Sequence, residues 1–485
     1  MGFKIDTSFL RFLKMGATGV RATMESLRAE GFNPIELERY STSSKIWATK
    51  VKRLRLPDVV CVRTGLRVEV RAKSDLKIRM SDAPANPNRR WDIGLRDGDF
   101  VAFVPCRSEN EDVIVPSKPV FFSVGDLRAS VRATKLGPPK SASEGAERDR
   151  EWPSTVPSQD GVVIELTQQK IISQLSSGRR QTYQLQNKRP YVSVGDRFAG
   201  KTSIIAGVVP RLAPLSEARQ RTWDPVRTLG APDAVDRYAA AKVIPHRDAA
   251  PTKAVSTLLR RMREEPDERV ALELAASAAR LGDEAGFRHV VSTVWNHEHG
   301  SLRMEAVLIL SELGNAAALA ELMRIASAAE FAGDELRQAA AWGLGRAGCR
   351  SYDQLVRLLR DDEDAVVLHA IAAFGPDTPA DVVASLVRIL QEGSLRQRAA
   401  ASEALRLIGS EEVLHALITA ARRGDASSVW VLTTLGRLPA AKVRSTLAGD
   451  PLLQRVEPLL ALSPSENWLT TPASGADLAF LLMQV

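Results

Sequence analysis

The hydrophobic and polar positions of the first 130 residues predict one helix followed by several strands. Apolar residues recur at helical spacing over residues 9–30, and Gly31 with Asn33-Pro34 marks the end of that helix. Four short runs then show β-branched composition or strict alternation, and they cover residues 56–62, 66–73, 100–104 and 120–124. A helix packed on such a sheet predicts an α/β/α sandwich over residues 1–133.

The middle of the chain changes composition twice. Residues 134–158 are rich in Pro, Ser, Gly and charge, which predicts a linker. Residues 159–215 contain short strand-like runs separated by turn glycines, which predicts a small all-β barrel or sandwich. This segment resembles the sandwich-barrel hybrid modules of bacterial RNA polymerase β subunits and of lipoyl-type carriers. Residues 216–251 are expected to connect it to the C-terminal region.

The last part of the chain is helical and repetitive. Glycines recur at intervals of 32, 34, 27, 34 and 27 between residues 282 and 436, and three of the copies carry an Arg eleven residues before the Gly. A period near 30 with two helices per unit is typical of a solenoid. Residues 252–460 resemble HEAT repeats, with residues 461–485 as a tail or cap. The fold class expected for the whole chain is therefore multidomain α+β.

Charge separates these regions. The net charge is +8, but residues 1–108 carry 21 Lys and Arg against 12 Asp and Glu, and the other 377 residues carry 45 against 46. The whole basic excess lies in the first fifth of the chain. This asymmetry predicts a polyanionic partner for that segment, DNA or RNA, with a solvated basic surface as the alternative.

Several classes of protein are excluded by the sequence. No stretch approaches 18 apolar residues, and the charged N-terminus does not resemble a secretory signal, so no membrane association is expected. Only three cysteines occur, none spaced for a zinc site, which favours a reducing, cytoplasmic location. All six histidines follow residue 245, so chemistry in the basic segment has to proceed without histidine.

One group of residues in the basic segment can carry chemistry. Asp58 ends the motif Pro57-Asp58, and Glu69 follows eleven residues later in the alternating run VEVRAK, which also contains Arg71 and Lys73. This arrangement resembles the PD-(D/E)xK nuclease superfamily. The resemblance implies that Asp58 and Glu69 are ligands of Mg²⁺ or Mn²⁺ and that a cation beside them acts on the phosphate and the attacking water.

The cation departs from the family pattern. The family places a lysine two residues after the acid, and here that position is Arg71. Lys73 is four residues from Glu69, about 13 Å along a regular strand, and would need a bulge, or a side chain that folds back, to reach a metal at Glu69. Three alternatives remain: Arg71 has the lysine's role, Lys73 has it from a bulged strand, or the site is inactive. Glu69, Arg71 and Lys73 can also simply form a salt-bridged polar sheet face.

Further residues are expected to hold nucleic acid or to complete the metal site. The candidates for binding the nucleic-acid backbone or a base are Lys50, Lys52, Arg53, Arg55, Arg89, Arg90 and Trp91. The alternative for Trp91 is a side chain anchored in the core. Additional candidate acids are Glu36, Glu38, Asp82 and Asp92.

These patterns indicate three alternative functions. The first is a metal-dependent DNA endonuclease whose solenoid binds a regulatory protein, with defence against foreign DNA as an analogy only. The second is an inactive nuclease fold that binds nucleic acid. The third is a HEAT-repeat scaffold that binds protein. Homo-oligomerisation is open in all three.

Overall fold

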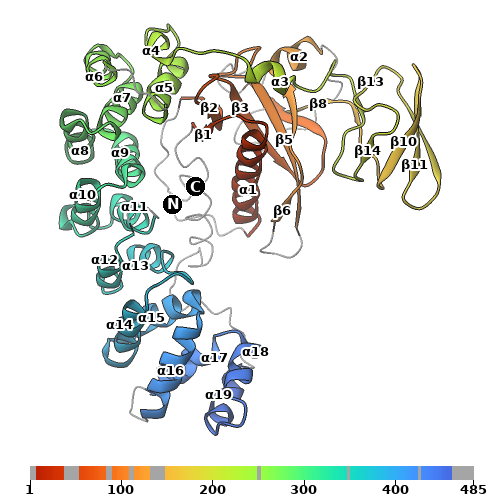
Figure 1. The fold of residues 1–485 in the computed structure, drawn as a ribbon. Helices are drawn as coiled ribbons and strands as arrows, with labels where there is room; N and C mark the ends of the chain where they lie inside the picture. The colour runs from red at the N-terminus through yellow and green to blue at the C-terminus, as the bar shows by residue number, and fades with distance from the viewer. Residues whose placement is uncertain are drawn as a thin grey trace. The chain divides into compact units, whose positions relative to one another are not determined.

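The computed structural model describes residues 7–37, 54–82, 90–108, 114–130, 148–247, 253–346, 350–423 and 428–460. The chain divides into two compact units (Figure 1). We call the described residues of 11–286 the sheet unit and those of 287–460 the solenoid unit. The chain is thus a mixed α+β protein with a strand-rich N-terminal region and a helical C-terminal region. No described helix is long and apolar enough to cross a membrane.

The strands of the sheet unit are β1 (Pro34–Glu36), β2 (Val59–Cys61), β3 (Arg67–Lys73), β4 (Ile78–Asp82), β5 (Phe100–Ser108), β6 (Ile114–Pro116), β7 (Val120–Ser123), β8 (Arg148–Trp152), β9 (Ser154–Thr155), β10 (Gly161–Leu166), β11 (Lys170–Leu175), β12 (Arg180–Gln184), β13 (Arg189–Pro190), β14 (Arg197–Phe198) and β15 (Ala206–Gly207). Its helices are α1 (Thr7–Ala29), α2 (Val124–Ala129), α3 (Leu215–Arg219), α4 (Pro225–Thr228), α5 (Ala234–Val243), the 3-10 helix η3 (Ile244–His246), α6 (Ala254–Glu264) and α7 (Glu268–Arg280).

The central sheet of this unit is mixed. Its strand order is β1-β2-β3-β5-β6, with β7 also paired to β5. β1, β2 and β3 form an antiparallel meander, whereas β5 runs parallel to β3. The turn between β2 and β3 closes at Gly65, whose φ of +65° favours glycine and whose N–H donates to Cys61 O at 2.8 Å. The helix and the strands β2, β3, β5 and β7 therefore confirm the expected elements.

The two faces of the central sheet have different partners. α1 covers the face that carries Val68, Val70 and Ala72, and a Cβ added at Gly19 of α1 would stand 2.8 Å from the Ala72 Cβ, so the helix backbone packs directly on β3. On the other face, Val60 joins a core with α5 and α7. Strand β3 alternates, so Arg67, Glu69, Arg71 and Lys73 lie on this second face.

Part of the segment expected to be a linker forms strands. β8 pairs with β4 over five residues, from Ile78↔Trp152 to Asp82↔Arg148, and β9 pairs with β15. Trp152 is buried, and its Nε1 donates to Leu127 O at 3.1 Å. Residues 148–155 thus belong to the packed structure of the sheet unit.

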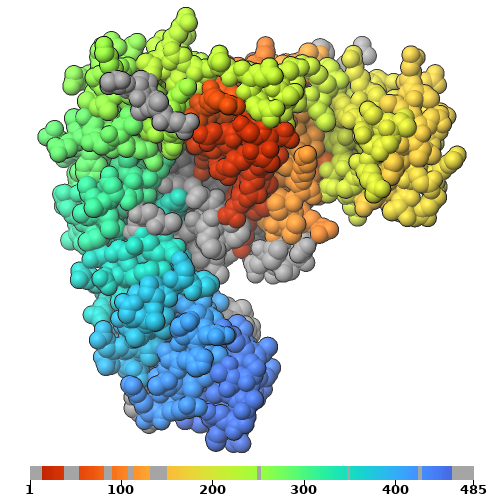
Figure 2. Space-filling view, in the orientation of Figure 1, coloured from red at the N-terminus to blue at the C-terminus, as the bar shows by residue number. Residues whose placement is uncertain are grey.

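The segment expected to be a small β-domain consists of two sheets. One has the order β12-β11-β10-β14, and the other has the order β13-β15-β9. Both contribute to one core around Val163, Ile171, Phe198 and Ile205. This part of the chain is yellow in Figure 2 and lies at the surface of the molecule.

The solenoid unit is built from paired helices. They are α8 (Glu284–Asn296), α9 (Gly300–Leu313), α10 (Ala316–Ala326), the 3-10 helix η4 (Ala329–Phe331), α11 (Glu335–Leu344), α12 (Tyr352–Leu358), α13 (Asp364–Ile371), α14 (Ala380–Glu392), α15 (Leu395–Ile408), α16 (Glu411–Arg423), α17 (Ser428–Gly436), α18 (Ala440–Thr446) and α19 (Leu452–Leu460). The second helices of successive pairs, α9, α11, α13, α15 and α17, contact one another in order.

Two of the repeated glycines in the solenoid unit end the second helix of a repeat, as expected. Gly314 and Gly409 are left-handed C-caps of α9 and α15, with φ of 61° and 53°. Each donates its N–H to the carbonyl of the residue four positions earlier, Leu310 and Leu405. A residue with a Cβ would be strained at these two positions, so Gly314 and Gly409 mark the ends of α9 and α15.

The repeated arginine joins the two helices of one repeat. The Nε of Arg303 donates to Val294 O at 2.8 Å, that of Arg337 to Ala326 O at 2.9 Å, and that of Arg398 to Gly393 O at 2.7 Å. Each acceptor lies in the last turn or at the C-cap of the preceding helix, where carbonyls lack intrahelical partners. A fixed cation at a helix C-terminus is also favourable to the helix dipole.

We expect Arg337→Met to destabilise the solenoid unit by roughly 2–4 kcal/mol. Arg337 is 9% exposed and also forms ion pairs with Asp361 and Glu363, so methionine would leave two half-buried carboxylates unpaired. The matched control is Arg398→Met, which loses the same kind of carbonyl contact and should cost about 1–2 kcal/mol. Urea denaturation followed by circular dichroism measures both, and equal losses would contradict the role of the ion pairs.

Acid should also destabilise the solenoid unit through a buried histidine. His369 of α13 is buried, its Nδ1 lies 2.6 Å from Ala365 O, and burial lowers its pKa to about 4, against an opposing effect of the Glu335 charge. The unfolded chain protonates this histidine near pH 6.5, whereas the folded chain does not until about pH 4. The stability of the solenoid unit should therefore fall by about 3 kcal/mol as the pH decreases through this window.

The control for the acid effect is another histidine with the same local contact. His415 of α16 also places Nδ1 near the carbonyl four residues earlier, at 2.8 Å from Glu411 O, but it is exposed. His369→Gln should flatten the dependence of the unfolding midpoint on pH, and His415→Gln should leave it unchanged. An unchanged slope in His369→Gln would show that other groups cause the acid sensitivity.

Candidate functional site

Asp58 and Glu69 meet at the start of β2. The pairing Val59↔Val68 places position 58 opposite position 69 in the antiparallel register. Asp58 Oδ2 accepts a hydrogen bond from the N–H of Val70 at 2.7 Å, which holds the carboxylate against β3. Asp58, directly before β2, and Glu69, in β3, thus lie on neighbouring segments of the chain, because the turn at Gly65 fixes the register.

Arg71 is the cation beside this pair. Its Nη1 lies 2.6 Å from Glu69 Oε1, and the two side chains are 35% and 17% exposed. Both belong to the second face of β3, two residues apart, where side chains point the same way. The ion pair leaves the guanidinium partly open to solvent, and it fits both alternatives for this strand: a cation of a site and a salt-bridged polar face.

The bulge that Lys73 would need is not present. β3 pairs with β5 in an unbroken parallel register from Val68↔Phe100 to Lys73↔Pro105. The alternative in which β3 bulges to bring Lys73 to Glu69 is therefore wrong, whereas a Lys73 side chain that folds back toward Glu69 stays a prediction. Arg71, two residues after Glu69, is the cation that the structure places in contact with Glu69.

A buried ion network that sequence reasoning missed lies next to the pair. Arg67, 2% exposed, donates through Nε and Nη2 to Asp99 Oδ2 at 2.9 and 2.6 Å, and through Nη1 to Asp236 Oδ1 at 3.0 Å. Arg96 also pairs with Asp236. The network joins β3 to α5, and the alternation of β3 indicated only that Arg67 shares a face with Glu69.

The structure describes only some of the residues predicted to bind nucleic acid. Lys50, Lys52, Arg53 and Arg89 lie outside the described residues, as do Glu38 and the side chain of Asp82. Arg55 and Arg90 are exposed. Their position on the surface is compatible with contact to a backbone phosphate, which stays a prediction.

Trp91 contradicts the stacking role. Its side chain is 7% exposed and meets Trp152 edge-to-face, with ring centroids 5.3 Å apart. A ring enclosed in this core cannot stack on a base, so the prediction is wrong and the alternative of a core anchor is correct. No local pattern indicated this contact, since Trp152 lies in the segment expected to be a linker.

The additional acids do not converge on the pair. Asp92, 5% exposed, accepts from Arg128 Nε at 2.8 Å and from Arg90, so it is committed to a surface ion network. Glu36 pairs with Val59 and therefore lies on the face opposite to Asp58. Among the residues that the structure describes, no group of three or more His, Cys, Asp or Glu is placed to hold a metal ion.

The cysteines of the sheet unit are not candidates for nucleophiles. Cys61 and Cys106 are both buried. Burial raises the pKa of the Cys61 thiol to about 12 and that of Cys106 to about 11. Neither forms an appreciable amount of thiolate near neutral pH.

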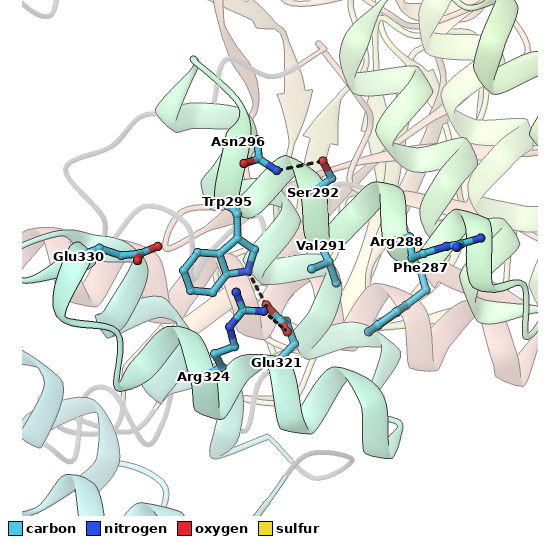
Figure 3. Close-up of a pocket in the computed structure, with 9 residues that line it drawn as sticks. All are labelled: Phe287, Arg288, Val291, Ser292, Trp295, Asn296, Glu321, Arg324 and Glu330. Atoms are coloured by element: carbon cyan, nitrogen blue, oxygen red, sulfur yellow. Dashed lines mark hydrogen bonds and ion pairs between the residues drawn. The ribbon is translucent and has the colours of Figure 1, made fainter.

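The solenoid unit has a cavity of about 540 Å³ between α8, α10 and η4 (Figure 3). Its lining residues are Phe287, Arg288, Val291, Ser292, Trp295, Asn296, Glu321, Arg324 and Glu330. The Arg324 guanidinium stands 4.0 Å from the centroid of Trp295, and the indole N–H of Trp295 donates to Glu321. Behind them, Trp295 stacks on Phe331 at 4.8 Å, and Arg303 covers Phe331 at 4.9 Å.

This alternation of cations and aromatic rings makes one wall of the cavity rigid. Each guanidinium lies over a ring face, where the quadrupole attracts a positive charge. Arg324 is held again by Glu321, at 3.3 Å from both carboxylate oxygens. The cavity thus offers an aromatic wall with fixed charges at its rim.

Comparison with known proteins supports the helical repeats. Residues 287–375 match the family model of HEAT repeats, a range that contains all nine lining residues of the cavity. No curated protein matches the chain. A crystal structure of an engineered protein is similar at 13% identity over 56% of this chain and 88% of its own, but its TM-score of 0.23 carries no argument about fold.

Substitutions in the cavity wall should lower the free energy of unfolding by different amounts. Trp295→Ala should destabilise the solenoid unit by about 2 kcal/mol, because it removes a half-buried indole and its contacts with Phe331 and Arg324. Arg324→Ala should cost less than about 1 kcal/mol, since the side chain is largely exposed. Arg288→Ala, which lines the same cavity, is the control and should be neutral. Urea denaturation measures all three, and a neutral Trp295→Ala would contradict a rigid wall.

Proposed function

We propose that the protein is a metal-dependent DNA endonuclease that hydrolyses phosphodiester bonds at Asp58 and Glu69. The observation that carries this proposal is the register of β2 and β3, which sets these two acids opposite each other with Arg71 beside them. The helix-then-sheet order of α1 and the meander, which the resemblance to PD-(D/E)xK nucleases implies, supports it as well.

The residues present fit a magnesium ion. Mg²⁺ takes one or two protein carboxylates and completes its shell with water and phosphate oxygens, so a pair of acids is a sufficient donor set. Asp58 and Glu69 would hold the ion, which when bound supplies a Lewis acid for the phosphate and lowers the pKa of a water. The N–H of Val70 fixes the Asp58 carboxylate in one orientation, as a ligand position requires.

Arg71 would act on the substrate phosphate. A guanidinium is a poor general base, but its planar set of N–H donors suits it to pairing with phosphate oxygens. The ion pair with Glu69 keeps the guanidinium at the site until a phosphate competes for it. The charge that develops on the phosphate would then be stabilised by a cation already in place.

The test compares isosteric variants. Supercoiled plasmid is incubated with the full chain in Mg²⁺, Mn²⁺ or EDTA, and nicking is followed on gels. Asp58→Asn keeps an acceptor for the Val70 N–H and should lower metal-dependent cleavage by at least about 100-fold, as should Glu69→Gln. The matched control is Asp75→Asn, an exposed acid in the same unit that pairs with Lys77.

The contradicting outcomes are equally specific. Cleavage that survives both substitutions would place the active site elsewhere in the chain. If the wild-type protein binds DNA but does not cleave it in Mg²⁺ or Mn²⁺, the protein is an inactive nuclease fold that binds nucleic acid. Arg71→Ala should reduce cleavage more than Lys73→Ala. A larger effect of Lys73→Ala would show that the assignment of the cation is wrong.

A second candidate function is binding of a protein partner by the solenoid unit. The observation that favours it is the match to HEAT repeats over residues 287–375 together with the cavity that this range contains. HEAT repeats are solenoids that present extended binding surfaces. On this proposal the Trp295 wall receives a side chain of the partner, and loss of metal-dependent cleavage would leave partner binding intact.

A further inference from the structure

We propose that the four-stranded sheet β12-β11-β10-β14 binds the phosphodiester backbone of duplex DNA through its solvent-facing side. Residues 159–210 carry seven Lys and Arg against three Asp and Glu, a local excess that is hidden in the near-neutral remainder of the chain. This surface is distinct from the Asp58–Glu69 pair, so the inference goes beyond the proposed hydrolysis and does not depend on it.

The pairing of the strands defines the binding face. Arg180 is opposite Gln174, Gln174 is opposite Val162, and Val162 is opposite Arg197. Directly paired residues point to the same side of a sheet, so these four form one row across all four strands. We call this side the outer face.

Burial distinguishes the outer face from the inner one. The alternate positions Val163, Ile171 and Phe198 are buried in the core of the two sheets. Arg180 and Arg197 are exposed, as are Thr182 and Gln184 further along β12. The next positions on the outer face of β11, Ile172 and Lys170, are opposite Thr182 and Gln184.

The arginines are available to a ligand whereas the acids are engaged. Asp160 accepts from the N–H of Gly200 and Asp196 from the N–H of Ser193, each at 2.7 Å, and Glu165 pairs with Lys170 at 3.8 Å. Within the part of the chain that the structure describes, no ion pair engages Arg180 or Arg197. The outer face therefore has two arginines open to an anion.

The spacing of the two arginines matches a regular polyanion. Three strand separations place their Cα atoms about 14 Å apart, which spans about four base-pair steps of a duplex. A planar guanidinium contacts two oxygens of one phosphate, and Thr182 and Gln184 supply neutral polar groups further along β12, beyond Arg180. The described outer-face positions of residues 161–198 hold no aromatic ring, so we expect backbone contact without base stacking or sequence preference.

The experiment measures the salt dependence of binding. The full chain is titrated into a fluorescein-labelled duplex DNA in EDTA, and anisotropy gives Kd at several NaCl concentrations. Arg180→Ala/Arg197→Ala should raise Kd roughly tenfold at low salt and reduce the slope of log K against log [salt] by about 2, one unit for each lost phosphate contact. Arg180→Lys/Arg197→Lys keeps the charge and should retain the slope.

The control is Arg189→Ala, which removes an exposed arginine from β13 of the other sheet. An unchanged slope in the double alanine variant overturns the proposal. An equal effect of Arg189→Ala also overturns it, because DNA would then be attracted by the positive charge of the whole β-domain and not by the outer face. Competition by polyglutamate as strong as that by unlabelled duplex also overturns it, in favour of an acidic protein. Binding is measured in EDTA and nicking in Mg²⁺ or Mn²⁺, so failure of the hydrolysis proposal and failure of this one are separable.

Discussion

The guanidinium of Arg67 is the interaction on which the sheet unit depends. It lies on the central strand of a mixed sheet, nearly without solvent, and its charge is balanced by Asp99 before β5 and Asp236 in α5. A buried cation without such partners would cost several kcal/mol, so the helices that come after the β-domain have to return to the sheet. This requirement places α5 and α7 on the face of β3 that carries Glu69 and Arg71.

The candidate site is a consequence of that arrangement. On the second face of the sheet, the strands beside β3 are covered by apolar cores, one around Val60 of β2 and one around Phe103 of β5. β3 itself carries polar side chains on this face, so the face is only partly buried there. Along β3, the exposed fraction of the side chains increases from Arg67 to Glu69 to Arg71. Polar side chains on this face become accessible after Arg67, at Glu69 and Arg71, which are the residues that the proposed hydrolysis uses.

Sequence periodicity predicted the elements whose stability is local, because α1, β2, β3, β5 and β7 each carry their own helical or alternating pattern. The repeat arginines were found in the same way, although their contact with the carbonyls that end the previous helix is visible only in three dimensions. The features that were missed depend on partners far away in the sequence. β4 and β8 pair across more than sixty residues, and only the contact with Trp152 shows that Trp91 is internal. Asp236 is 169 residues from Arg67, a distance over which no local pattern carries information.

The pairing of β4 with β8 has a consequence for how this chain folds. The core around Trp91, Phe103 and Phe122 lacks its cover until Trp152 has been synthesised, and Arg67 lacks one of its two carboxylates until residue 236. Contacts this distant slow folding and leave apolar surface open during synthesis. The N-terminal sheet therefore leaves the ribosome before Trp152 and Asp236, but it can complete its core and its buried ion network only after both have emerged.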